Sequence, residues 1–252
     1  MSGRPWRSAL VGLASAWWAA CGSSPAYLDT ITWTSRAPGV PIVVRLIPAA
    51  DVTVHNGERW KDRSLADQPW LMVGSNGTGD VWFTYLTFDL SAVTPGTLPD
   101  SATLSLMANT SLVLPQDGQD LDVNVWVVND EWTESNITWQ AQPRILTTAA
   151  HTFTVRPGSS AERVDLGELV SDCLLDGCTR LSVLLTPADP SRDFRIRWFS
   201  REAPVAGDPS AAQTDTVDFA RLDGPSPWVL RNGALQLSLE LEWMAPLGTE
   251  PP

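Results

Sequence analysis

The sequence predicts an all-β protein: an antiparallel two-sheet β-sandwich of jelly-roll type with one short helix. Three observations predict it. Apolar and polar residues alternate with a period of two in many short segments, and 20 Pro and 17 Gly supply frequent turns between them. Only one stretch has a helical pattern. A chain of 252 residues is also within the range of a single sandwich domain.

The expected strands follow one another along the chain with turn-rich segments between them. The last is the clearest, because apolar side chains occupy every second position from Leu235 to Trp243. Such a strand has one face in the core and one in solvent. The other alternating segments are 85–90, 103–108, 121–128 and 194–199, and the turn-rich segments are 74–79, 94–96, 115–118 and 186–190. The expected helix covers 166–175 and stops at Gly177.

The first residues have the organisation of an export signal. Arg4 and Arg7 precede an uncharged, largely apolar run to Ala20, which is too short for a membrane span. The small residues before Cys21 make the region resemble a bacterial lipoprotein processing site, with Cys21 as the lipidated residue and Gly22 favouring the outer membrane. The alternative is an ordinary secretory signal. We expect a signal peptide at 1–20, a tether at 21–47, a domain at 48–244 and a Pro-rich tail at 245–252.

The other two cysteines, Cys173 and Cys178, lie close together in the sequence. In an exported protein such a pair is typical of a disulfide that closes a short loop. The alternative is a metal or redox dithiol, for which the sequence offers no second ligand pair nearby. We therefore expect a structural disulfide.

Charge and composition exclude several functions. The chain has 17 basic against 29 acidic residues, a net charge of −12, so we expect no nucleic-acid partner. Two histidines and the lack of any phosphate-loop, esterase or zinc-protease motif argue against most enzymes. Asp51, Asp80 and the 117–122 loop offer oxygens suited to a structural Ca²⁺. The loop has the wrong spacing for an EF-hand, and Asp-Gly-rich loops usually form turns, so we assign no metal or other cofactor.

Five segments carry a family resemblance. They are Ala50-Asp51, the Leu-Thr-Phe-Asp-Leu-Ser strand at 86–91, the Leu-Pro-Asp-Ser-Ala-Thr-Leu-Ser-Leu segment at 98–106, the Trp-Thr-Glu-x-x-Ile-Thr-Trp element at 132–139, and Ser-Arg-Glu at 200–202. In order and spacing they resemble the DNRLRE-domain family, also classed as carbohydrate-binding module family 96 and related to disaggregatase repeats. The resemblance covers residues 49–243. It implies a secreted, non-catalytic β-jelly-roll module, some relatives of which bind alginate-like or other cell-surface polysaccharides.

Several aromatic and basic residues are candidates for binding a carbohydrate. Exposed tryptophan and tyrosine rings stack on the C–H faces of sugars, and guanidinium groups pair with carboxylates. The aromatic candidates occupy the strand positions that alternate with the apolar core positions, or lie in a mixed-charge loop. The arginines occupy alternate positions on the same face of one strand. The candidates are Trp60, Trp70, Tyr85, Trp126, Arg195 and Arg197.

Each candidate has a structural alternative. A loop or the tether would cover the aromatic rings, and Arg195, Arg197 and Arg201, which share that parity, would pair with acidic side chains. Within the 132–139 element, we expect Trp132 and Trp139 to plug the sandwich while Glu134 and Thr138 satisfy a turn.

The sequence therefore favours a non-catalytic, lipid-anchored module that binds an extracellular or cell-envelope polysaccharide. Because arginines pair with carboxylates, uronate-containing polymers are among the expected ligands. We expect it to be exported, as an outer-membrane or cell-surface lipoprotein that meets the membrane through its lipid alone. A structural or adhesion lipoprotein that binds a partner protein is the alternative. A polysaccharide-degrading enzyme is less favoured, because no catalytic group is identified.

Overall fold

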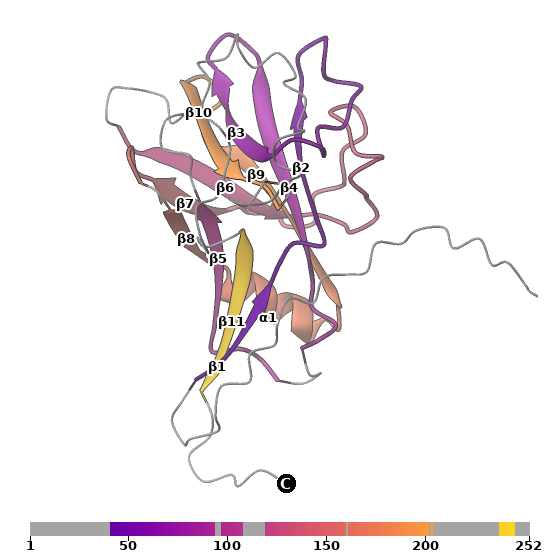
Figure 1. The fold of residues 1–252 in the computed structure, drawn as a ribbon, viewed down its shortest axis with the longest axis vertical. Coiled ribbons are helices and arrows are strands. Elements are labelled where there is room, and N and C mark those ends of the chain that lie inside the picture. The colour runs from indigo at the N-terminus through magenta and orange to yellow at the C-terminus, as the bar shows by residue number, and fades with distance from the viewer. Residues whose placement is uncertain are drawn as a thin grey trace, which may run out of the picture.

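The computed structural model describes residues 41–93, 97–107, 119–159, 161–201, 203 and 237–244. These residues form two antiparallel sheets and one helix (Figure 1). The elements, in chain order, are β1 Pro41–Leu46, β2 Ala50–His55, β3 Trp70–Asn76, β4 Val81–Asp89, β5 Ser101–Met107, β6 Leu121–Val127, β7 His151–Val155, β8 Ala161–Asp165, α1 Gly167–Leu175, β9 Arg180–Pro187, β10 Asp193–Phe199 and β11 Ser238–Met244.

The strand order is that of a jelly roll with three additions. The smaller sheet has the order β1-β11-β5-β8, and the larger has β10-β3-β4-β9-β6-β7, with β2 also paired to β4. When β2, β3 and β10 are set aside, the remaining strands follow the double Greek key of a jelly roll. The predicted all-β sandwich with one short helix is confirmed.

Alternation along the strands builds the core between the two sheets. Leu121, Val123 and Val125 of β6 face this core, and Leu239 and Leu241 of β11 meet them from the smaller sheet. All five side chains are at most 1% exposed. Their burial removes a large apolar area from water, and the favourable free energy of this burial is the main contribution that holds the sheets together.

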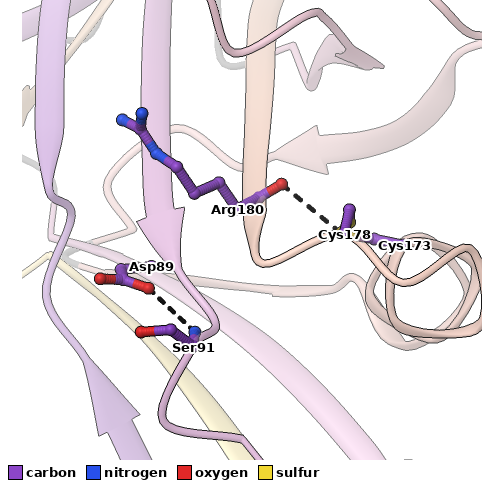
Figure 2. Close-up of a disulfide and its surroundings, with 5 residues drawn as sticks. All are labelled: Asp89, Ser91, Cys173, Cys178 and Arg180. Atoms are coloured by element: carbon purple, nitrogen blue, oxygen red, sulfur yellow. Dashed lines mark hydrogen bonds between the residues drawn. A yellow bond between two sulfur atoms is a disulfide. The ribbon is translucent and has the colours of Figure 1, made fainter. Parts of the chain in front are cut away.

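Helix α1 packs on the core and carries one cysteine of the disulfide. Val170 of the helix is fully buried, and Cys173 packs against the same core. The predicted disulfide between Cys173 and Cys178 is confirmed, and it spans the turn between α1 and β9 (Figure 2). In that turn the Cys178 N–H donates to the Cys173 carbonyl at 3.0 Å, and Gly177 has a φ of 74°. The disulfide therefore fixes the end of the helix against the start of β9.

The domain begins earlier than predicted. Residues 41–46, which we assigned to the tether, form β1 and pair with β11, with Val44 opposite Leu241. This short strand has little alternation of its own, and its partner lies almost 200 residues away, so local pattern could not identify it. The signal peptide at 1–20, Cys21, the rest of the tether and the tail at 245–252 lie outside the described residues. Within the described residues, no helix has the length and apolar character needed to cross a membrane.

Gly74 of β3 makes a corner in the larger sheet. It pairs with Arg195 of β10 and with Trp82 of β4. A Cβ at this position would lie 2.1 Å from the Phe194 carbonyl oxygen, so only glycine allows this close approach. Three strands therefore meet at one residue, and this junction positions the site described next.

On the N-terminal side of Gly74, strand β3 no longer pairs with β4, and side-chain hydrogen bonds replace the backbone ladder. The Met72 N–H donates to Thr53 Oγ1 at 2.9 Å, and Thr84 Oγ1 donates to the Met72 carbonyl at 2.9 Å. Both threonines are fully buried. Because each backbone group keeps a partner, β3 can diverge from the sheet without leaving these buried polar groups unpaired.

Candidate functional site

Four of the six predicted binding residues gather around the Gly74 corner. Trp70 comes from β3, Arg195 and Arg197 come from β10, and Trp60 comes from the loop between β2 and β3. Trp82 of β4 joins them. Trp60 and Trp82 pack against the same small apolar group, which is Leu65, Trp70 and Met72. We call Trp60, Trp70, Trp82, Arg195 and Arg197 the tryptophan–arginine cluster.

Each tryptophan of the cluster lies near a guanidinium group. The Arg195 Cζ is 5.9 Å from the centroid of the Trp82 ring, and the Arg197 Cζ is 5.5 Å from that of Trp70. Arg59, a neighbour of the cluster, places its Cζ 4.9 Å from the Trp60 ring. These distances are those of cation–π contacts, so aromatic rings and positive charge occur together here.

His55 supports the cluster from below. Its ring stacks on Trp82 with centroids 4.3 Å apart and planes 8° apart. The histidine is 7% exposed, its Nε2 lies 4.0 Å from Asp80 Oδ1, and burial lowers its pKa. A Cβ on Gly57 would lie 2.7 Å from the His55 Cε1, so the loop that carries Gly57 and Trp60 packs closely against the His55 ring. His55 thus links Trp82 to that loop.

The cluster has a surface layer and a buried layer. Trp60 and Trp82 are partly exposed, and the Arg195 side chain is 22% exposed, with its Nη2 3.8 Å from Asp193 Oδ1. Trp70 and Arg197 are each 5% exposed. Trp70 and Arg197, which are ligand-binding candidates from the sequence, are therefore buried in this structure. Leu65, in the loop after β2, packs on Trp70, so a residue on the outer face of its strand is still buried.

Tyr85 is not an exposed aromatic residue. It is 0% exposed, with Trp132 edge-on at 5.7 Å, and its hydroxyl donates to Gln142 Oε1 at 2.8 Å. Burial raises the pKa of the Tyr85 hydroxyl. Of the two alternatives considered from the sequence, coverage by a loop is the correct one: the segment after β6 covers this face of β4 with Trp132 and Ile137.

Trp126 lies apart from the tryptophan–arginine cluster. It is partly exposed on β6 and packs at the edge of a second apolar group, which contains Tyr85, Trp132 and Leu184. Its indole Nε1–H donates to Thr186 Oγ1 of β9 at 3.1 Å. The sequence candidates therefore fall in two places on the larger sheet, not on one.

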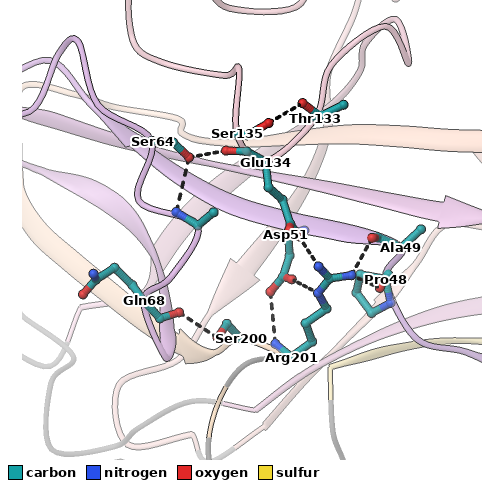
Figure 3. A network of polar contacts seen from close by, with 11 residues as sticks. Pro48, Ala49, Asp51, Ser64, Gln68, Thr133, Glu134, Ser135, Ser200 and Arg201 are labelled. Atoms are coloured by element: carbon teal, nitrogen blue, oxygen red, sulfur yellow. Dashed lines mark hydrogen bonds and ion pairs between the residues drawn. The ribbon is translucent and has the colours of Figure 1, made fainter. Parts of the chain in front are cut away.

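Three of the segments that carry the family resemblance, at Asp51, Glu134 and Arg201, meet at a polar network (Figure 3). Arg201 Nε lies 3.1 Å from Asp51 Oδ1, and the Arg201 backbone N–H donates to Asp51 Oδ2 at 3.1 Å. Arg201 Nη2 lies 2.5 Å from Glu134 Oε1, which also accepts the Asp51 N–H at 2.9 Å. The network ties the start of β2, the loop after β6 and the end of β10 together.

This network shows which of the structural alternatives holds for each motif residue. Arg201 pairs with acidic side chains, as the structural alternative predicted, and its partners are Asp51 of β2 and Glu134 of a loop. Trp132 is buried, and Thr138 accepts the Ala141 N–H within a turn, as expected. Glu134 does more than satisfy a turn, because its carboxylate bridges Arg201 and the backbone of Asp51.

Trp82 and His55 are the site residues that the sequence did not reveal. Trp82 has the same parity as Leu86 and Phe88, which face the core, so alternation alone would place it inside. Because β3 turns away from β4 at Gly74, Trp82 packs with the Leu65, Trp70 and Met72 group and not with the main core. The only local feature of the sequence that could indicate this corner is Gly74, in a segment predicted to be a turn.

A comparison with family models gives the class of protein. The model of carbohydrate-binding module family 96 matches residues 42–211, well over half of the chain. The chain belongs to carbohydrate-binding module family 96, and this membership supports a role in binding carbohydrate. A search of curated proteins found no match. Among the described residues, no three His, Cys, Asp or Glu side chains gather as a metal site would require.

Proposed function

We propose that this protein is a non-catalytic module that binds an extracellular or cell-envelope polysaccharide through the tryptophan–arginine cluster. The observation that carries the proposal is the pairing of partly exposed indoles, Trp60 and Trp82, with Arg59 and Arg195 in a carbohydrate-binding family. Trp70, Arg197 and His55 lie beneath and hold these groups in place. A largely formed site costs little conformational entropy on binding.

The arginines favour a ligand with carboxylate groups. A guanidinium forms bidentate hydrogen bonds with a carboxylate, while an indole face stacks on the apolar side of a sugar ring. The net charge of −12 repels a polyanion at long range, but salt screens this repulsion beyond about 8 Å, so the local arginines dominate at contact. A uronate-containing polysaccharide is therefore the ligand class that we propose.

The carboxylates of the family motif have a structural use. Asp51 and Glu134 both pair with Arg201, and Asp51 is buried at the start of β2. General acid–base catalysis on a glycosidic bond needs two carboxyl groups that converge on the substrate. Carboxylates held by one guanidinium suit the joining of strands better than this chemistry, which supports a non-catalytic module.

The proposed setting is the cell envelope. The export signal at 1–20 and lipidation at Cys21 would place the domain on a membrane, at the outer membrane or the cell surface, with the tether giving it reach. This part of the proposal rests on the sequence alone. Mass spectrometry of the protein purified from membranes tests it, because a diacylglyceryl and acyl addition on a chain beginning at Cys21 is the expected result.

Binding by the cluster is tested by calorimetric titration with a hexauronate. We expect Trp60→Ala and Arg195→Gln each to weaken binding at least tenfold, since both remove a partly exposed contact. Arg163→Gln is the matched control, because Arg163 is an exposed arginine on β8 of the smaller sheet. Equal affinity of all three variants and the parent protein would refute the cluster as the binding site.

The same proteins distinguish the module from the alternative adhesion role. If the partner is a protein, crosslinking in membranes would capture it, and added polysaccharide would leave the capture unchanged. A polysaccharide-binding module predicts instead that soluble hexauronate releases the protein from its envelope ligand. Release of reducing ends from the polymer by purified protein would contradict the non-catalytic assignment.

A further inference from the structure

A second group of side chains on the larger sheet has the features of a binding site. Asn124 and Trp126 of β6 lie on the side of the strand opposite to the core residues Val123 and Val125. By register, Asn124 is opposite Thr152 of β7 on one side and Thr186 of β9 on the other. We call Asn124, Trp126, Thr152 and Thr186 the Trp126 row.

Hydrogen bonds fix the side chains of this row. Thr152 Oγ1 donates to Asn124 Oδ1 at 2.8 Å. Trp126 is opposite Leu184 in register, yet its indole N–H reaches Thr186, so the indole extends diagonally along β9. An aromatic ring held in one orientation beside hydroxyl and amide groups is pre-organised for a flat ligand.

Three of the four side chains of the row reach the surface, while Thr186 is 9% exposed and accepts the indole N–H. Thr152 is exposed, and Asn124 and Trp126 are partly exposed. The apolar group beside them, with Tyr85 and Trp132, is buried. Asn124 accepts the Thr152 hydroxyl through Oδ1, which leaves its amide N–H groups for a ligand. The row thus presents donors, acceptors and an aromatic surface together.

The charge of the row selects the ligand. Asp122 lies next along β6, is exposed, and accepts a hydrogen bond from Thr154 Oγ1 at 2.7 Å. Of the outward-facing side chains described on β6 and β7, none is basic. A carboxylate-bearing sugar would therefore meet repulsion from Asp122, and the outward-facing side chains of β6 and β7 supply no cation to offset it. Arg192, beside the start of β6, is held by the Asp120 carbonyl and Gln119 Oε1.

From these contacts we infer that the Trp126 row is a second carbohydrate site, which takes an uncharged, hydroxyl-rich saccharide. The indole of Trp126 stacks on the C–H face of a sugar, and Asn124 and Thr152 bond to its hydroxyls. Neighbouring strands lie about 4.8 Å apart, so side chains of adjacent strands can reach hydroxyls of one sugar residue. The site goes beyond the proposed function and does not depend on the tryptophan–arginine cluster.

The test is calorimetric titration of the full domain with uncharged hexaoses of β-1,4-linked glucose, mannose and xylose. We expect at least one of them to bind, with Asn124→Ala and Thr152→Ala each weakening it at least fivefold. Trp126→Phe, which keeps an aromatic ring but loses the bond to Thr186, should weaken it as well. Thr103→Ala on β5 of the smaller sheet is the matched control and should leave the affinity unchanged.

A hexauronate titration of the same variants separates this inference from the proposed function. The Trp126 row variants should bind hexauronate as the parent does. Arg195→Gln should bind hexauronate at least tenfold more weakly than the parent and bind the uncharged hexaose with unchanged affinity. No binding of any uncharged hexaose, or binding that Asn124→Ala and Thr152→Ala leave unchanged, would overturn the second site. If the parent protein binds an uncharged hexaose but does not bind hexauronate, only the proposed function is overturned.

Discussion

Arg201 shows how a single residue holds distant segments in place. Its side chain is 29% exposed, while the Asp51 side chain that it pairs with is 0% exposed. A buried carboxylate requires a partner, because its desolvation is otherwise uncompensated. Arg201 also donates to the Pro48 carbonyl at 3.2 Å. The residue is thus the link between β10 and the chain that leads into β2.

Replacing Arg201 with Gln should lower the free energy of unfolding by about 3 kcal/mol, because Asp51 is then left buried without its counter-charge. Urea denaturation followed by tryptophan fluorescence measures the change. Arg163→Gln is the control, since its pair with Glu240 is 59% exposed on the arginine side and should contribute less than about 1 kcal/mol. Equal losses in both variants would contradict a special role for Arg201.

His55 should make stability depend on pH. Burial lowers its pKa from the ordinary value of 6.5, so below pH 6.5 the unfolded chain takes up a proton that the folded chain resists. The free energy of unfolding should therefore fall as the pH falls through this range. In His55→Phe, which keeps a ring against Trp82 and does not titrate, this fall should be smaller.

Urea unfolding at pH 7.5 and pH 5.5 measures the difference between His55→Phe and the parent. Asp80 faces His55, and Arg195 lies near Trp82, so both charges remain in the variant. His151→Gln is the control for the second histidine. An equal fall with pH in the parent and in His55→Phe would contradict the assignment.

Among the elements, β3 and its corner decide where the site forms. Gly74 pairs with residues of both β10 and β4. The part of β3 before Gly74, which carries Trp70 and Met72, is not paired with β4. Gly74→Ala should destabilise the fold by at least about 2 kcal/mol, because the new Cβ would meet the Phe194 backbone. Denaturant unfolding checks this.

Gly177→Ala is the comparison for Gly74→Ala. Gly177 has a φ of 74°, but a Cβ there would have no neighbouring atom within 4 Å, so alanine should cost only about 1 kcal/mol of backbone strain. If the two alanine variants lose the same stability, the close approach at Gly74 does not matter, and the corner is not enforced by sterics.

The strands show what local pattern can predict. The strands β4, β5, β6, β10 and β11 were foreseen, because each has one face in the core and the alternation records it. Strands β3, β7, β8 and β9 are not among the predicted segments, and the predicted turns at 74–79 and 186–190 overlap the ends of β3 and β9. Strand β1 is not predicted either, because it has few alternating residues and a partner at the other end of the chain. The helix and the disulfide were predicted, since their signals lie within a few residues of each other.

The candidate site was predictable only in part, for a physical reason. Parity tells which side chains leave the core, but not what covers them afterwards. Tyr85 and Trp70 leave the core and are then buried under loops, whereas Trp82 has core parity and is partly exposed. Loop coverage depends on tertiary contacts such as the Arg201 network, which no local pattern contains.

At the scale of the whole molecule, the strands added to the jelly-roll order carry most of the candidate site. Strands β2, β3 and β10 provide His55, Trp70, Arg195 and Arg197, and the inward-facing side chains of β3 and β10 also pack in the main core (Figure 1). Of the cluster and its support, only Trp82 belongs to the jelly-roll set. A rigid scaffold with the binding residues on added elements is a common arrangement in binding proteins.

The central claim is that carbohydrate meets the protein at the tryptophan–arginine cluster. Nuclear magnetic resonance of the indole N–H groups during titration with a hexauronate tests it most directly, because each tryptophan reports its own surroundings. We expect the resonances of Trp60 and Trp82 to shift with added ligand, while those of the buried Trp132 and Trp198 stay in place. Saturable binding with no shift at Trp60 or Trp82 would contradict the claim.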